Sequence, residues 1–86
     1  MEREDEIKVL MKDRCTKKEA EDALKRGSIV YPDFEENLEL YLAEAEEMID
    51  KEYAESLRRM VETKTEVCDW SIVEMDDKRY YIQYVN

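Results

Sequence analysis

The chain has 86 residues, of which 44% are charged, and its 24 acidic and 14 basic side chains give a formal net charge of −10. This length fits a single domain over residues 1–86 with a small core. The acidity argues against direct binding of DNA, RNA or anionic lipid, because each phosphate contact needs a base.

The segment before Gly27 predicts a strand and then a helix. Apolar residues alternate over residues 7–11, which favours a first short strand. Thr16 and Glu19 then form the sequence pattern of a capping box, and Gly27 is a typical residue just past a helix C-terminus. We therefore expect the first helix to run roughly over residues 17–26.

Residues 29–31 predict a second short strand. Their sequence, Ile-Val-Tyr, is β-branched and aromatic, which suits a pleated and partly buried surface. Pro32 holds the residue before it in an extended conformation and lacks the N–H that a continuing ladder would need. The strand is therefore expected to end at Tyr31.

Residues 33–64 predict two further helices, the first capped by Asp33. At 100° per residue, the apolar side chains after Asp33 fall within an arc of about 120°. These residues are Phe34, Leu38, Tyr41, Leu42, Ala45, Met48 and Ile49, and we place Leu38 and Leu42 in the core. Beyond Asp50 the stripe turns by roughly 110°, and one uninterrupted helix of about 48 Å would be longer than the domain. This favours a break near residues 50–52 over a single helix, with the last helix ending near Lys64.

The C-terminal segment predicts a β-hairpin over residues 66–85. Two runs rich in Val, Ile, Trp and Tyr flank Asp76-Asp77, a candidate two-residue turn. This turn would place Glu74 opposite Arg79, an opposite-charge pair. The predicted fold is thus α+β, with three helices packed on a small antiparallel sheet that includes this hairpin. Its aromatic residues favour a core role over a partner-binding patch; they are Trp70, Tyr80, Tyr81 and Tyr84.

Nearly all the net charge lies in residues 33–55, which hold ten carboxylates and one base, Lys51. Six of the acids occupy one arc of the predicted helix, and we assign them as candidate partner-binding residues: Glu35, Glu36, Glu39, Glu46, Glu47 and Asp50. Along a helix, ten charges over 23 positions give roughly one per 3.4 Å, similar to the phosphate spacing of one DNA strand. A soluble helix usually mixes bases among its acids, so this one-sided charge favours a binding surface, although a merely solvated face also fits.

The sequence contains no recognisable catalytic or cofactor motif. It has no histidine and only one glycine, and it holds no phosphate-binding loop and no calcium-binding loop. Cys15 and Cys68 lack metal-site spacing, and we expect both to be free buried thiols. We therefore expect a protein that is not an enzyme, has no cofactor and binds no metal. The charged N-terminus and the lack of a long apolar run favour a cytosolic protein without a membrane anchor.

Small size, strong acidity and a helix-plus-hairpin layout resemble the acidic proteins of phages and mobile elements, including anti-CRISPR inhibitors and other DNA mimics. The resemblance is one of type and has no diagnostic residue motif. It implies that Asp and Glu side chains stand in for phosphates and occupy the nucleic-acid channel of a basic nucleic-acid-binding protein. Two alternatives have the same composition: an acidic adaptor or antitoxin-like module that neutralises a basic protein, and a structural domain without intrinsic activity.

Overall fold

The computed structural model describes residues 1–85, which form two compact units. Residues 1–32 and 68–85 make up the first, here called the sheet unit, and Asp33–Val67 make up the second, here called the helical unit. The predicted α+β class is confirmed. The described residues contain four helices where three were predicted, together with one antiparallel sheet of three strands. The single domain expected for residues 1–86 stays a prediction.

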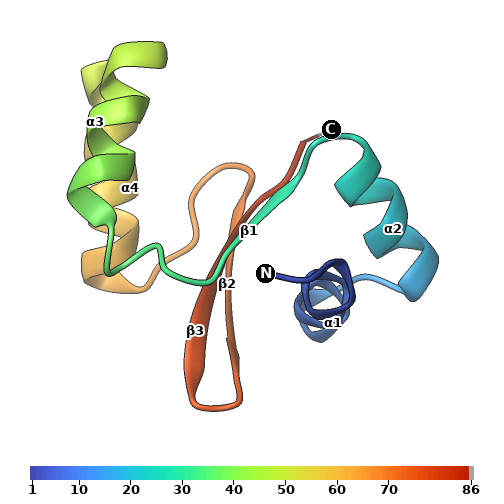
Figure 1. Cartoon of the computed structure of the whole chain (residues 1–86). Helices are drawn as coiled ribbons and strands as arrows, with labels where there is room; N and C mark the ends of the chain where they lie inside the picture. The colour runs from blue at the N-terminus through green and yellow to red at the C-terminus, as the bar shows by residue number, and fades with distance from the viewer. Residues whose placement is uncertain (86) are drawn as a thin grey trace. The chain divides into compact units, whose positions relative to one another are not determined.

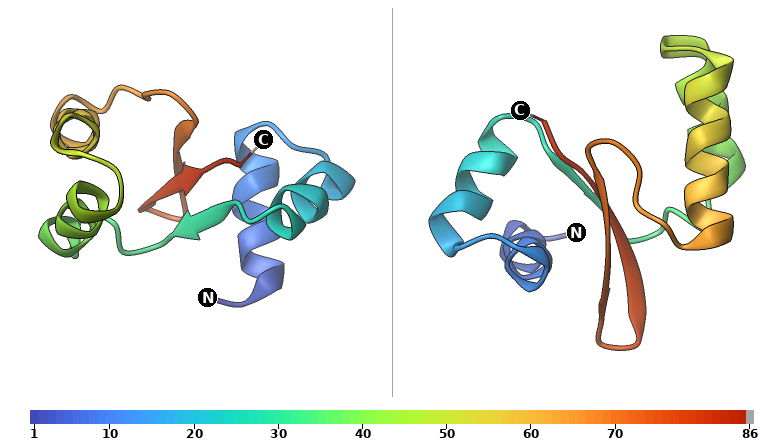
Figure 2. Two further views of the ribbon diagram at one scale, coloured as in Figure 1. Left: turned by 90° about the horizontal axis from the view of Figure 1, so that it is seen from above. Right: turned by 180° about the vertical axis from the view of Figure 1, so that it is seen from behind.

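The sheet unit contains two helices and all three strands. In chain order they are α1 (Arg3–Asp13), α2 (Lys17–Lys25), β1 (Ile29–Tyr31), β2 (Trp70–Met75) and β3 (Lys78–Gln83). The strand order is β1-β3-β2, so the last strand lies in the middle and pairs with both others. Figures 1 and 2 show α1 and α2 on the same side of this sheet.

The strand predicted over residues 7–11 is wrong, because these residues belong to α1. Val9 and Leu10 are adjacent in sequence and both belong to the same core, whereas a strand would point their side chains to opposite faces. Three acids in the first turn and Lys12 in the last turn match the helix macrodipole. The charged N-terminal segment is thus the start of a helix, and it supplies the fourth helix.

The second helix and the strand after it are confirmed. Thr16 accepts a hydrogen bond from the Glu19 N–H, and the Glu19 carboxylate accepts one from the Thr16 N–H at 2.8 Å, so the predicted capping box is present. Gly27 follows α2 with φ +106°, a conformation that favours glycine. Strand β1 ends at Tyr31, as Pro32 predicts.

The hairpin and its register are also confirmed. Glu74 pairs with Arg79, Val73 with Tyr80 and Ile72 with Tyr81, and Arg79 donates to the Glu74 carboxylate at 2.8 Å. The two turn residues, Asp76 and Asp77, both have positive φ, as a type I′ turn requires. The turn chemistry and the charge pair therefore agree on one register.

The core of the sheet unit lies between its two helices and one face of the sheet. Its buried members are Val9, Leu10, Ala20, Val30, Val73, Tyr80 and Ile82. On the other sheet face, the ring of Trp70 stacks on that of Tyr31 with centroids 5.5 Å apart. Trp70, Tyr80 and Tyr81 are buried and Tyr84 is half-buried, which favours the core interpretation of these aromatics.

The helical unit is a pair of helices, α3 (Leu38–Met48) and α4 (Lys51–Thr63), which pack side by side (Figure 1). The predicted break near residues 50–52 is confirmed. Asp50 caps α4, since its carboxylate accepts a hydrogen bond from the Tyr53 N–H at 2.8 Å. The predicted end of this helix near Lys64 is also confirmed; Lys64 is left-handed and donates to the Val61 carbonyl.

The predicted helix start at Asp33 is wrong, because residues 32–37 form turns and α3 begins at Leu38. The Asp33 carboxylate is held by two side chains rather than by backbone N–H groups of a first helical turn. It accepts hydrogen bonds from the Asn37 amide at 2.9 Å and from the Tyr41 hydroxyl at 3.1 Å. The ring of Phe34 stacks on that of Tyr41 with centroids 5.2 Å apart, which fixes this turn against α3.

Both cysteines are free, as predicted, but their predicted burial is wrong: Cys15 is half-buried and Cys68 is exposed. Cys68 stands in the connection to the sheet with φ 46°, outside any strand, so its side chain is not carried into the core. Within residues 1–85, no helix has the length and apolar character needed to cross a membrane.

Candidate functional site

The division of charge follows the division into units. The helical unit, Asp33–Val67, holds twelve of the acidic residues and four of the basic ones, a net charge of −8. The sheet unit holds the remaining twelve acids and ten bases, a net charge of −2. The acidic character of the protein is therefore a property of one helix pair and its flanking turns.

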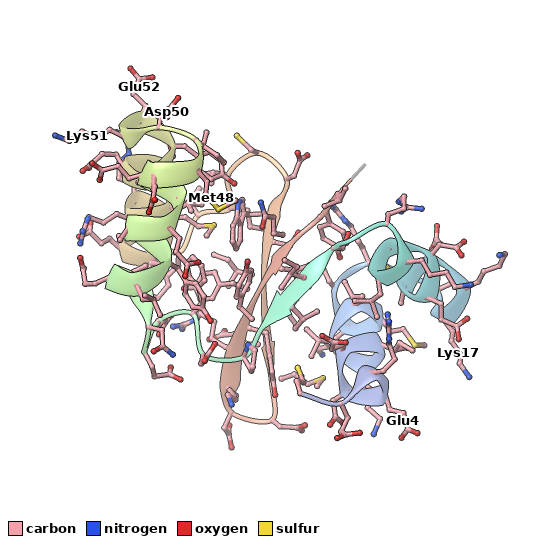
Figure 3. All side chains as sticks on the ribbon, turned by 45° about the horizontal axis from the view of Figure 1, so that its top comes forward. Glu4, Lys17, Met48, Asp50, Lys51 and Glu52 are labelled. Carbon is pink, nitrogen blue, oxygen red and sulfur yellow. The ribbon has the colours of Figure 1, made fainter. Side chains whose placement is uncertain are left out.

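The structure exposes five of the six predicted partner-binding residues and leaves the sixth, Glu35, half-exposed. Glu35 and Glu36 lie in the turns before α3, while Glu39, Glu46 and Glu47 lie on the helix. Asp50 lies in the connection to α4, and Figure 3 shows it with Lys51 and Glu52 at the end where the chain turns back. The acids thus share one helix pair without forming a single straight row.

The predicted spacing of one charge per roughly 3.4 Å is wrong, because it assumed that residues 33–55 form one continuous helix. The chain turns before Leu38 and reverses between Met48 and Lys51. Helix α3 alone holds four carboxylates in a length of about 16 Å, or about one per 4 Å. A short acidic rod of this kind spans only a few phosphates of a nucleic-acid strand.

Glu39 has an internal partner on the neighbouring helix. The Arg58 guanidinium donates two hydrogen bonds to the Glu39 carboxylate, at 3.0 and 3.1 Å. This bidentate contact and the charge of Arg58 lower the pKa of Glu39. The carboxylate remains well exposed, so the pair adds little stability, but part of its charge is already compensated.

The pKa of Glu39 gives a direct test of this pair. Because the folded-state pKa is lowered, the stabilisation is present above the unfolded-state pKa and is lost as the pH falls through the folded one. We expect Arg58→Met to raise the Glu39 pKa toward the ordinary glutamate value, as measured by side-chain NMR during a pH titration. Arg59→Met is the matched control and should leave it unchanged, since Arg59 is exposed and makes no contact with Glu39 in the structure. An unchanged Glu39 pKa in Arg58→Met would contradict the ion pair.

Sequence reasoning missed part of the exposed surface of α3. The predicted apolar arc contains Met48 and Ile49, but both are exposed. They lie where α3 ends, three and two residues before α4 begins at Lys51. Three further exposed residues of α3 fall in neither predicted arc: Leu40, Ala43 and Glu44. The helical period of 100° per residue could have predicted this exposure, since it places Leu40 about 160° from Leu38 and Leu42.

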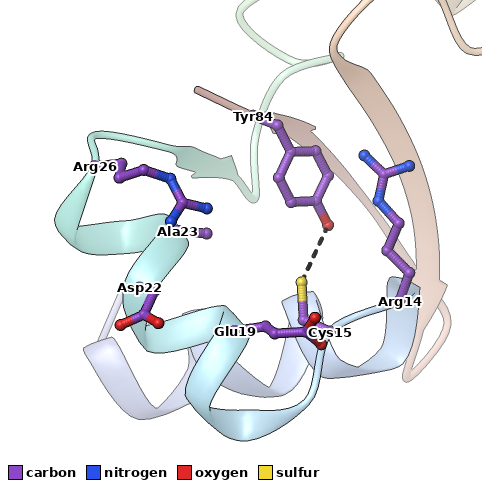
Figure 4. Close-up of a pocket in the computed structure, with 7 residues that line it drawn as sticks. All are labelled: Arg14, Cys15, Glu19, Asp22, Ala23, Arg26 and Tyr84. Atoms are coloured by element: carbon purple, nitrogen blue, oxygen red, sulfur yellow. Dashed lines mark hydrogen bonds between the residues drawn. The ribbon is translucent and has the colours of Figure 1, made fainter. Parts of the chain in front are cut away.

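A cavity of about 390 Å³ in the sheet unit is the other candidate site (Figure 4). Its lining residues are Arg14, Cys15, Glu19, Asp22, Ala23, Arg26 and Tyr84. The Tyr84 hydroxyl donates to the Asp13 carboxylate at 2.6 Å and lies 3.8 Å from the Cys15 sulfur. The Arg14 guanidinium lies 4.4 Å from the centroid of the Tyr84 ring.

These contacts give the cavity a structural role. Burial and the neighbouring Asp13 raise the pKa of Tyr84, so its phenol stays protonated and cannot act as a base near neutral pH. The other polar lining groups are engaged within the protein: Glu19 in the capping box, Asp22 with Lys18 at 3.4 Å, and Arg26 with the Val85 carbonyl at 3.3 Å. The Tyr84 and Arg26 contacts fasten residues 84 and 85 to α1 and to the end of α2.

Over residues 1–85, no three His, Cys, Asp or Glu side chains come together in a way that could hold a metal ion. The chain matches no protein-family model, no curated protein and no solved structure with significance.

Proposed function

We propose that this protein is an acidic inhibitor that occupies the basic nucleic-acid-binding site of a partner protein. The observation that carries the proposal is the charge of the helical unit, where residues 33–50 hold eight carboxylates and no base. Six of these carboxylates are exposed: Glu36, Glu39, Glu44, Glu46, Glu47 and Asp50. Like charges at this density repel one another, which costs stability unless a cationic surface compensates them.

The acidic surface fits the chemistry of a phosphate-binding groove. Lys and Arg side chains that bind phosphates also bind carboxylates, and Arg does so with the same bidentate geometry. The resemblance to anti-CRISPR inhibitors and DNA mimics supports a partner from phage defence or nucleic-acid regulation. The protein would act by competition alone, without turnover, cofactor or metal, in the cytoplasm of its host.

The proposal predicts that reversing exposed acids on the helical unit abolishes inhibition. The variant combines Glu36→Lys, Glu46→Lys and Glu47→Lys. Glu39 is left unchanged because it binds Arg58, and Asp50 because it caps α4. The matched control reverses three exposed acids of the sheet unit, Glu2, Glu4 and Glu21, and changes the net charge equally. Circular dichroism and thermal unfolding would check that both variants fold.

The measurement uses a partner identified by affinity capture from the native host and a labelled DNA or RNA bound to it. We expect the wild type and the control to displace the nucleic acid and the helical-unit variant to fail. Raising the salt well above 0.1 M, where the Debye length is about 10 Å, should slow association. Binding without displacement would favour the adaptor or antitoxin-like alternative, and the absence of any captured partner would favour a structural domain. Equal displacement by both variants would overturn the proposed binding surface.

A further inference from the structure

One face of α3 combines acidic and apolar side chains, and all of them are exposed. At 100° per residue, five residues of the helix fall within about 140°. They are Leu40, Ala43, Glu44, Glu47 and Met48. Leu40 has 57% of its surface exposed and Met48 has 82%. A single exposed apolar side chain is ordinary in a folded protein, but here two large ones lie two helical turns apart on one face.

Glutamates flank both apolar residues at helical spacing. Glu44 is four residues from Leu40 and four from Met48, while Glu47 is seven residues from Leu40. Residues four apart are neighbours on a helix surface, so Glu44 places a carboxylate beside both apolar side chains. Leu40 and Met48 are eight residues apart, a spacing that occurs in the apolar stripe of an amphipathic helix, and such a stripe can lie in a groove of a partner.

The negative charge of this face favours a basic partner protein over a second copy of the chain. A second copy of the chain would bring the Glu44 and Glu47 carboxylates of one molecule against those of the other, in a protein of net charge −10. A basic surface with an apolar pocket satisfies both kinds of side chain, since its Lys or Arg residues meet the carboxylates while the pocket takes up Leu40 and Met48. Charge supplies the rate of association and the buried anchors supply much of the affinity.

We infer that this exposed face of α3 is a docking surface on which Leu40 and Met48 anchor a basic partner protein through an apolar pocket. The inference rests on the proposed function, which supplies the premise that the partner is a basic protein. It adds that the partner's site contains an apolar pocket. A protein that only imitated phosphates would bind without such a pocket.

Two peptide probes with the same number of lysines test the inference: an amphipathic helical peptide of Lys and Leu, and a shorter polylysine. Methyl NMR of the full chain would follow the Leu40 and Met48 methyl groups. We expect the amphipathic peptide to shift these signals and to bind about tenfold more weakly to Leu40→Ala or Met48→Ala. Polylysine should bind all variants alike. Met11→Ala is the matched control, because Met11 is an exposed methionine of the sheet unit.

Several results would overturn the inference. One is an unchanged affinity of the amphipathic peptide for Leu40→Ala and Met48→Ala, and another is a dimer in sedimentation that these variants dissociate. A Met48 methyl shielded from a soluble paramagnetic agent in the free protein would show that the residue is already covered. If the charge-reversal variant stops displacing nucleic acid while Leu40→Ala and Met48→Ala displace it fully, the inference fails and the proposed function stands.

Discussion

Replacing Leu10 with alanine is expected to lower the free energy of unfolding by about 2 to 5 kcal/mol. Leu10 is fully buried in the core of the sheet unit. Met11, its neighbour on α1, is 46% exposed, and Met11→Ala should change the stability by no more than about 0.5 kcal/mol. In a protein of this size, 1 kcal/mol shifts the melting temperature by roughly 4 to 8 °C, so the two variants are easily separated.

This pair of variants distinguishes a helix from a strand over residues 7–11. In a strand, Val9 and Met11 would share the buried face and Leu10 would lie on the other. In the helix α1, Val9 and Leu10 share the buried face and Met11 turns away. Urea unfolding followed by circular dichroism measures both variants, and a larger loss for Met11→Ala than for Leu10→Ala would contradict the helix.

Elements with strong local signals could be predicted from the sequence. The capping box of α2 involves Thr16 and Glu19, only three residues apart, so the sequence contains the whole interaction. The hairpin register follows from a two-residue turn and from the Glu74–Arg79 pair beside it. The break before α4 follows from the change of phase and from Asp50 as its cap.

Elements whose identity depends on distant contacts could not be predicted. Residues 7–11 are apolar at both helical and strand spacing, and only the core they pack into decides between the two. Asp33 has the residue type and spacing of a helix cap. Its carboxylate instead accepts hydrogen bonds from the side chains of Asn37 and Tyr41, and α3 starts five residues later.

The candidate binding surface could be predicted in part. Composition places the acids on residues 33–55, and the structure places most of them on the exposed surface of the helical unit. The Glu39–Arg58 pair joins residues 19 apart in sequence, so it depends on how α3 and α4 pack. The exposure of Met48, the last residue of α3, also depends on packing that the helical period does not show.

Two leucines of α3 give the second large expected effect. Leu42 is 5% exposed, and Leu42→Ala should lower the free energy of unfolding by about 2 to 5 kcal/mol. Leu38 is half-buried, so Leu38→Ala should cost less than the same change at Leu42. Leu40 lies about 160° around the helix from Leu42 and is mostly exposed. Leu40→Ala should stay within about 0.5 kcal/mol of the wild type, because alanine also has the higher helix propensity.

The comparison of Leu42→Ala with Leu40→Ala uses the same substitution in the same helix, so the difference in helix propensity cancels. Denaturant unfolding of both variants therefore reports the difference in burial between the two leucines. A loss of stability at Leu40 equal to that at Leu42 would mean that Leu40 packs inside the protein and cannot contact a partner. A stable Leu40→Ala variant that binds weakly would instead separate a role in binding from a role in folding, because the lost affinity could then not be attributed to a loss of folded protein.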